Sequence, residues 1–254
     1  MLNQATLGKM QAMRMSAMAE AFAKQLESPQ FGELSFEERL GLLVDTEWTA
    51  REQRKLSRRL KRAKLRYQAS LEDIDFKTPR GLDRQVILSL GSGAWIGEHH
   101  NLVITGPTGT GKTYLASALA ERACRSGFSA HYARAPRLLQ DLVVARADGS
   151  YGRVLVKLAK TDLLVLDDWL IAPLKDQDRR DLLEIIEDRA ERSSTLVATQ
   201  LPVKAWHEAI GEPTLADAIC DRLIHRAHRI ELRGTSLRDR RSPGGRNGKK
   251  TGSG

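Results

Sequence analysis

A glycine-rich stretch near the middle of the chain has the spacing of a polyphosphate-binding loop. The pattern G-x-x-x-x-G-K-[ST] is met in full by Gly106, Pro107, Thr108, Gly109, Thr110, Gly111, Lys112 and Thr113. Such glycines let the backbone turn tightly and aim its N–H groups inward, at the positive end of the helix that follows. We therefore expect Lys112 to reach the β- and γ-phosphates of ATP and the Thr113 hydroxyl to ligate Mg²⁺. The alternative is a glycine-rich turn without a ligand.

Two adjacent carboxylates follow the third apolar run of the chain. Leu163 to Leu166 lead directly into Asp167 and Asp168. A strand that ends in acids beside a phosphate loop is typical of a magnesium site, so we expect Asp167 to hold Mg²⁺ directly or through water. We expect Asp168 to face the γ-phosphate and to orient or deprotonate the attacking water. The alternative for Asp168 is that it caps the next turn.

Other polar residues are weaker candidates. Thr199 and Gln200 end a fourth apolar run, where a side chain can hold the attacking water or contact the γ-phosphate. Arg222 lies in a helical stretch and could stabilise transition-state charge, often from a neighbouring subunit, although a surface arginine is an equal alternative. His225 and His228 are three residues apart without a third ligand, so we expect no metal site there.

Short apolar runs that alternate with helical stretches must position these side chains. The expected strands are residues 102–105, 129–134, 163–166, 196–199 and 229–232. This alternation predicts an α/β fold with a parallel five-stranded sheet between helices. Helical periodicity without such runs precedes it. The expected domains are a helical N-terminal domain for oligomerisation, partner or DNA contact (1–70), an ATPase domain (71–237) and a disordered basic tail (238–254).

The charge of the chain is concentrated in two segments. Its 254 residues carry 41 Lys and Arg against 32 Asp and Glu, a net +9. Residues 51–66 hold nine cations against one acid, and residues 222–254 hold ten against two, whereas residues 67–221 are mildly acidic. Such segments favour nucleic acid or an acidic partner, although a solvated helix face is the alternative. The candidates for DNA contact are Arg54, Lys55, Arg58, Arg59, Lys61 and Arg62.

Composition excludes several other classes of protein. The two cysteines have no ligand spacing, which argues against a disulfide framework or a zinc site. Charged residues interrupt every apolar stretch of the N-terminus, so we expect no secretory signal. No apolar run approaches the length needed to span a bilayer. We therefore expect a cytoplasmic protein without a membrane partner.

The order of these motifs resembles that of the IstB-like transposition helper ATPases over nearly the whole chain. The likeness rests on residues 106–113, Asp167-Asp168-Trp169, residues 199–203, Trp206-His207-Glu208 and residues 221–225. The family belongs to the AAA+ proteins and is similar to the DnaC helicase loaders. Those loaders share the phosphate loop and the motif order, but not the Trp206-His207-Glu208 or Asp167-Asp168-Trp169 strings.

The resemblance implies a function. It implies a magnesium-dependent ATPase with an AAA+ fold that forms a homo-oligomer on duplex DNA. The oligomer would recruit or stimulate its cognate transposase at the target site during insertion-sequence transposition. The alternative in the same fold is a DnaC-like replicative helicase loader. Alternatives from other classes are a small-molecule P-loop kinase and a non-catalytic DNA-binding adaptor.

The resemblance also assigns roles to single residues. Lys112 and Thr113 match the Walker A pair, and Asp167 matches the Walker B magnesium residue. Asp168 stands at the position of the catalytic glutamate. Gln200, beside Thr199, occupies the sensor 1 position, and Arg222 falls in the segment that supplies the trans-acting arginine finger. Sensor 2 is either absent or supplied by Arg238.

Overall fold

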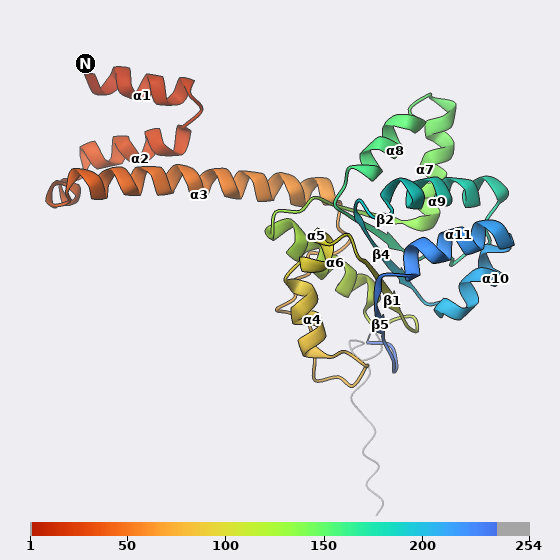
Figure 1. Ribbon diagram of the computed structural model, residues 1–254. Coiled ribbons are helices and arrows are strands. Elements are labelled where there is room, and N and C mark those ends of the chain that lie inside the picture. The colour runs from red at the N-terminus through yellow and green to blue at the C-terminus, as the bar shows by residue number, and fades with distance from the viewer. Residues whose placement is uncertain (1, 238–254) are drawn as a thin grey trace, which may run out of the picture. The chain divides into compact units, whose positions relative to one another are not determined.

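The chain divides into two compact units, residues 1–58 and 59–254. The computed structural model describes residues 2–237 (Figure 1). The basic tail expected at 238–254, including Arg238, therefore lies outside the described residues. The division lies within the long helix α3 (Phe36–Ala63), whose last residues belong to the second unit.

The first unit consists of helices. Its elements are α1 (Leu2–Ala12), α2 (Ser16–Glu27), the 3₁₀ helix η1 (Pro29–Glu33) and most of α3. A capping box starts α3, since the Ser35 N–H donates to Glu38 Oε2 at 2.8 Å and the Glu38 N–H donates to Ser35 Oγ at 3.2 Å. Buried Glu47 on α3 accepts the N–H of Met18 at 3.1 Å. That bond caps the first turn of α2 from a different helix.

The second unit contains a five-stranded sheet in which every pair of neighbours is parallel. The order is β2-β3-β4-β1-β5. The strands are β1 (Asn101–Thr105), β2 (Ala130–Arg134), β3 (Leu163–Asp167), β4 (Ser194–Thr199) and β5 (Ala227–Glu231). All residues of β3 and β4 are buried, as expected for strands covered on both faces. The five-stranded parallel sheet expected from the sequence is confirmed.

Helices cover both faces of this sheet (Figure 1). Helix α6 packs on one face, and α7, α9 and α11 pack on the other. The helices of the second unit after α3 are α4 (Arg84–Gly91), α5 (Ala94–Gly97), α6 (Lys112–Arg125), α7 (Ala135–Ala147), α8 (Tyr151–Ala159), α9 (Asp176–Arg189), η2 (Val203–Ala205), α10 (Trp206–Ile210) and α11 (Pro213–Ile224). None of the helices from residue 2 to residue 237 has the length and apolarity to span a membrane.

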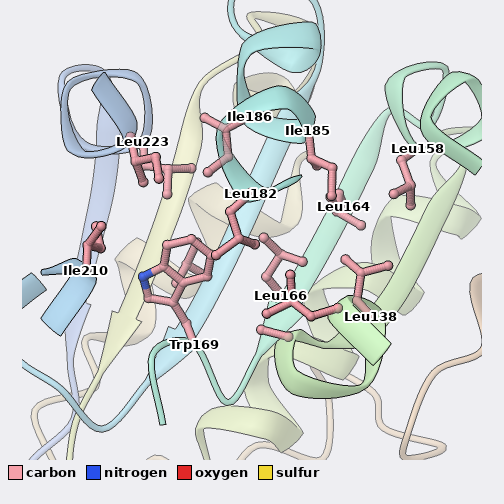
Figure 2. Close-up of a cluster of buried hydrophobic side chains, with 14 of the residues drawn as sticks. Leu138, Leu158, Leu164, Leu166, Trp169, Leu182, Ile185, Ile186, Ile210 and Leu223 are labelled. Atoms are coloured by element: carbon pink, nitrogen blue, oxygen red, sulfur yellow. The ribbon is translucent and has the colours of Figure 1, made fainter. Parts of the chain in front are cut away.

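A large hydrophobic cluster fills the space between the sheet and the helices that follow β2. Figure 2 shows Trp169 within this cluster, with side chains from β3, α7, α8, α9, α10 and α11 around it. The indole of Trp169 is 1% exposed and lies 5.8 Å from the ring of Trp206, centroid to centroid. Because Trp169 directly follows the two aspartates, this packing anchors the turn that carries them.

Candidate active site

The loop of residues 106–111 joins β1 to α6 at the carboxyl edge of the sheet. Gly106 has φ +147° and Gly109 has φ +84°, a backbone conformation that side chains disfavour. A Cβ at Gly106 would overlap the carbonyl oxygen of Leu232, and one at Gly109 would overlap Ser236. The chain after β5 thus passes close to the loop, and both positions require glycine.

Lys112 begins α6 and its ammonium group lies against the loop. Lys112 Nζ donates to the carbonyl oxygens of Gly106 at 2.7 Å and Pro107 at 2.8 Å. Two backbone carbonyl oxygens therefore hold the Lys112 ammonium group at the loop. Anionic phosphate oxygens are stronger acceptors for an ammonium group than carbonyls, so Lys112 can exchange these bonds for a polyphosphate.

Thr113 and Asp167 meet, although 54 positions separate them in the sequence. Thr113 Oγ1 donates to Asp167 Oδ2 at 2.9 Å, and Asp167 is 1% exposed. A hydroxyl beside a carboxylate fits Mg²⁺, which takes oxygen ligands and usually binds one or two carboxylates together with substrate phosphates and water. The described part of the chain has no cluster of three or more His, Cys, Asp or Glu side chains able to hold a metal ion by themselves.

Asp168 is held by an arginine from the neighbouring strand. Its backbone has φ +55°, a left-handed conformation that aspartate tolerates better than most residues. Arg134 Nε, at the end of β2, donates to Asp168 Oδ2 at 2.6 Å. Arg134 therefore holds the Asp168 carboxylate beside the end of β2.

Gln200 and Thr199 differ in their contacts. Gln200 Oε1 accepts a hydrogen bond from Thr108 Oγ1 of the loop at 2.7 Å, so its amide reaches the phosphate-binding region. Thr199 is buried, and its hydroxyl donates to the Trp169 carbonyl at 2.6 Å and accepts the Leu201 N–H at 3.0 Å. Those bonds hold the turn after β3 against the end of β4.

Arg222 lies away from the phosphate loop of its own chain. Its carbonyl oxygen accepts from Asn101 Nδ2 at 2.9 Å, and Asn101 starts β1, whereas the loop follows the other end of that strand. Its side chain donates to Glu187 Oε1 on α9 at 2.7 Å. The structure therefore brings Lys112, Thr113 and the residues after β3 and β4 together, but not Arg222.

Two side chains of β2 contact the aspartates and were missed by sequence reasoning. Tyr132 Oη donates to Asp167 Oδ2 at 2.6 Å, and Arg134 binds Asp168. Tyr132 and Arg134 are two residues apart and so lie on the same side of the strand. Polar side chains at alternate positions of a short strand were the available signal, but only the pairing of β2 with β3 shows what they contact.

A buried arginine also contacts the loop. Arg80 is 7% exposed, and its guanidinium donates to the carbonyl oxygens of Thr110 and Asp75, each at 2.9 Å. Burial lowers the pKa of Arg80. Because a guanidinium can only donate hydrogen bonds, Arg80 fixes the outer side of the loop through its backbone carbonyl. Nothing in the sequence around Arg80 predicted this contact.

The cations proposed for DNA contact lie on α3, on both sides of the division between the units. Arg54, Lys55 and Arg58 belong to the first unit, and Arg59, Lys61 and Arg62 to the second. Within the first unit, Arg54 binds Glu47 at 3.1 Å and Lys55 binds Glu52 at 2.7 Å. Helix α3 ends at Ala63, and Lys64 follows with φ +52°.

Comparison with known proteins gives a consistent result. A family model described as IstB-like ATP binding protein matches residues 8–244. The insertion sequence ATP-binding protein y4pL of Sinorhizobium fredii is 52% identical over 238 residues, which are 94% of this chain and 97% of the relative. The ATP-binding protein of insertion sequence IS1162 from Pseudomonas fluorescens is 50% identical over 203 residues, 80% of this chain and 88% of the relative.

Solved structures show the same fold at lower identity. The DnaC helicase loader aligns with a TM-score of 0.57 and 20% identity, over 67% of this chain and 99% of the loader. The replication initiator DnaA bound to AMPPCP and single-stranded DNA aligns with a TM-score of 0.57 and 18% identity, over 68% of this chain and 52% of the initiator. At this identity the two alignments establish the fold alone.

Proposed function

The chain belongs to the family of IstB-like ATP-binding proteins and is an AAA+ ATPase, and from this premise we propose that it serves the transposition of an insertion sequence. It assembles into a homo-oligomer on duplex DNA with ATP and Mg²⁺, and recruits or stimulates the cognate transposase at the target site. The names of the relatives, which are insertion sequence proteins, support this proposal over a DnaC-like helicase loader.

The contact between Thr113 and Asp167 carries the catalytic part of the proposal. Bound Mg²⁺ would be held by these two residues and would neutralise charge on the β- and γ-phosphates. The loop N–H groups and the Lys112 ammonium bind the phosphate oxygens. Gln200, placed by its bond to Thr108, orients the attacking water. Asp168, positioned by Arg134, accepts a proton from that water.

The position of Arg222 supports an oligomer. In its own chain Arg222 lies near the start of β1, at the edge opposite the phosphate loop. An arginine there cannot neutralise charge at its own γ-phosphate, but it can reach the site of a neighbouring copy. A trans-acting arginine makes hydrolysis depend on assembly, so ATP turnover reports on the oligomer.

The proposed DNA contact is made by the cationic residues between positions 51 and 66, at the end of α3 and directly after it. Phosphate contacts release counterions, so the affinity for DNA falls with salt by a slope of about −0.9 for each phosphate neutralised. The body of the ATPase between residues 67 and 221 is mildly acidic, and a uniform cationic surface is therefore not the source of DNA affinity. The cationic residues of α3 can be changed without touching the loop.

DNA binding measured at several salt concentrations tests this proposal. Replacing Arg58, Arg59, Lys61 and Arg62 with serine should weaken binding and reduce the steepness of the salt slope by about 3.6, which is about 0.9 for each of four phosphate contacts. The matched control replaces four exposed cations of α7 and α8 with serine and should keep the wild-type slope: Arg137, Arg153, Lys157 and Lys160. Equal slopes for the two variants would assign the cationic segment to protein contacts.

The choice of partner needs a second assay. The proposal predicts that duplex DNA stimulates ATP hydrolysis and that the DNA-bound protein retains the transposase of the same insertion sequence. Retention of a replicative helicase in place of the transposase would support the helicase-loader alternative. Transfer of the γ-phosphate to a nucleoside or metabolite would contradict both.

A further inference from the structure

Asp167 receives two hydrogen bonds on the same carboxylate oxygen. Thr113 Oγ1 donates to Oδ2 at 2.9 Å, and Tyr132 Oη donates to Oδ2 at 2.6 Å. Both of these side-chain bonds fall on Oδ2 and leave Oδ1 on the other side of the carboxylate. Two donors on one oxygen fix the rotation of a carboxylate, so Oδ1 keeps a single direction.

The hydroxyl proton of Tyr132 is directed at Asp167. The Arg66 guanidinium lies beside the phenol of Tyr132, and this neighbour raises the pKa of Arg66. The phenol has one proton, which it donates to Asp167 Oδ2, and a guanidinium beside it can only donate, so Arg66 disfavours any turn of that proton toward itself. Burial, together with the hydrogen bond to Asp167, raises the pKa of Tyr132, and the phenol therefore stays a donor.

The segment that carries Arg66 is docked on the strand that carries Tyr132. The His131 imidazole of β2 lies beside the backbone of Arg62. The ring of Tyr67 lies 6.3 Å from that of Tyr114, the residue after Thr113. Arg66 also lies over the ring of Tyr67, with its guanidinium carbon 5.8 Å from the ring centroid. These neighbours place the segment around Arg66 beside β2.

We propose that Tyr132 is a positioning residue for the magnesium carboxylate and that Arg66 fixes the direction of its hydroxyl. The inference rests on the proposed role of Asp167 and adds the residues that orient it. With Oδ2 pinned by Tyr132 and Thr113, Oδ1 is presented to Mg²⁺ or to its bound water. Groups that orient a metal ligand in this way usually change metal affinity by about 10-fold to 100-fold when removed.

A merely structural phenol would produce a different result. Tyr151 offers the matched control, because its hydroxyl also donates to carboxylates, Asp181 Oδ1 at 3.0 Å and Glu184 Oε2 at 2.6 Å, away from the phosphate loop. Tyr132→Phe and Tyr151→Phe each remove one hydroxyl and leave the ring. Both should lose stability, but only the first should change the response to magnesium.

The experiment measures binding of a fluorescent ATP analogue to the full chain, in EDTA and across a Mg²⁺ titration. Tyr132→Phe should raise the apparent Mg²⁺ dissociation constant at least about tenfold and leave the affinity in EDTA unchanged. Tyr151→Phe should match the wild type in both. Arg66→Met should shift the Mg²⁺ constant in the same direction, and Arg66→Lys should restore most of it.

Two outcomes would overturn the inference. If folded Tyr132→Phe has the Mg²⁺ dependence of Tyr151→Phe, the phenol is only structural. If Tyr132→Phe does not fold, the test uses Arg66→Met, because Arg66 is exposed and its replacement leaves the core intact. Equal apparent Mg²⁺ dissociation constants for Arg66→Met and the wild type would then contradict the inference. Wild-type binding that does not respond to Mg²⁺ at all would instead refute the proposed role of Asp167.

Discussion

Thr199 and Gln200 are adjacent at the end of β4, and the structure predicts that substituting them affects different properties of the protein. Thr199 is 1% exposed, and both of its hydroxyl contacts are with backbone groups. Gln200 is exposed and contacts the phosphate loop. We therefore expect Thr199→Val to lower the stability of the fold and Gln200→Ala to lower the rate of hydrolysis.

The magnitude for Thr199→Val follows from its two partners. Valine has nearly the shape of threonine, so no cavity forms, but the Trp169 carbonyl and the Leu201 N–H each lose a partner. A buried polar group left unpaired costs about 1–3 kcal/mol, so the free energy of unfolding should fall by about 3 kcal/mol. For a domain of this size that corresponds to a fall in Tm of about 6–12 °C.

Thermal unfolding and ATP turnover, measured on the same samples, test the distinction. Thr195→Val is the matched control, because buried Thr195 is the second residue of the same strand and its hydroxyl accepts from Arg189 Nε at 3.1 Å, at the end of β4 opposite the loop. Both threonine variants should unfold earlier and bind nucleotide normally below their Tm. Gln200→Ala should change stability by no more than about 0.5 kcal/mol. A Thr199→Val protein with wild-type Tm and no turnover would refute the reasoning and make Thr199 a chemical participant.

Three further predictions concern the site and the first unit. Asp168→Asn should bind ATP normally and hydrolyse it at least about 100-fold more slowly, because an amide cannot take a proton from water. Unchanged turnover would show that Asp168 is not the base of the reaction. Arg222→Ala should lower ATP turnover by about 1,000-fold. Mixing these chains with Lys112→Ala chains should partly restore turnover, because the Arg222→Ala chain supplies an intact phosphate loop and the Lys112→Ala chain supplies the arginine. Unchanged turnover on mixing would contradict action in trans. Glu47→Ala should speed amide exchange in residues 16–27, because the Met18 N–H loses its buried acceptor; unchanged exchange there would contradict the capping role.

Local patterns predicted the sheet and the phosphate loop, and the reason is physical. β3 and β4 are buried on both faces, so each is an unbroken apolar run, and the loop is a contiguous motif whose glycines are required by the backbone itself. The Ser35 capping box is equally local, and the structure contains both of its hydrogen bonds.

Local sequence patterns could not predict the contacts that depend on which strands pair in the sheet. Tyr132 and Arg134 reach the aspartates only because β2 pairs with β3, which the sequence does not specify. The inward direction of the Thr199 hydroxyl depends on the turn that carries Trp169. The end of α3 at Ala63 was also not predicted, since the cationic run continues to Arg66 although Lys64 has already left the helix.

Nucleotide binding and steady-state hydrolysis by Lys112→Ala test the central claim most directly. The account predicts that this variant folds like the wild type, binds ATP with greatly reduced affinity and does not hydrolyse it, because its phosphates lose the ammonium group at the loop. Lys160→Ala, which removes an exposed lysine at the end of α8, should bind and hydrolyse ATP as the wild type does. Wild-type hydrolysis by Lys112→Ala would show that the loop of residues 106–113 is not the site of the reaction.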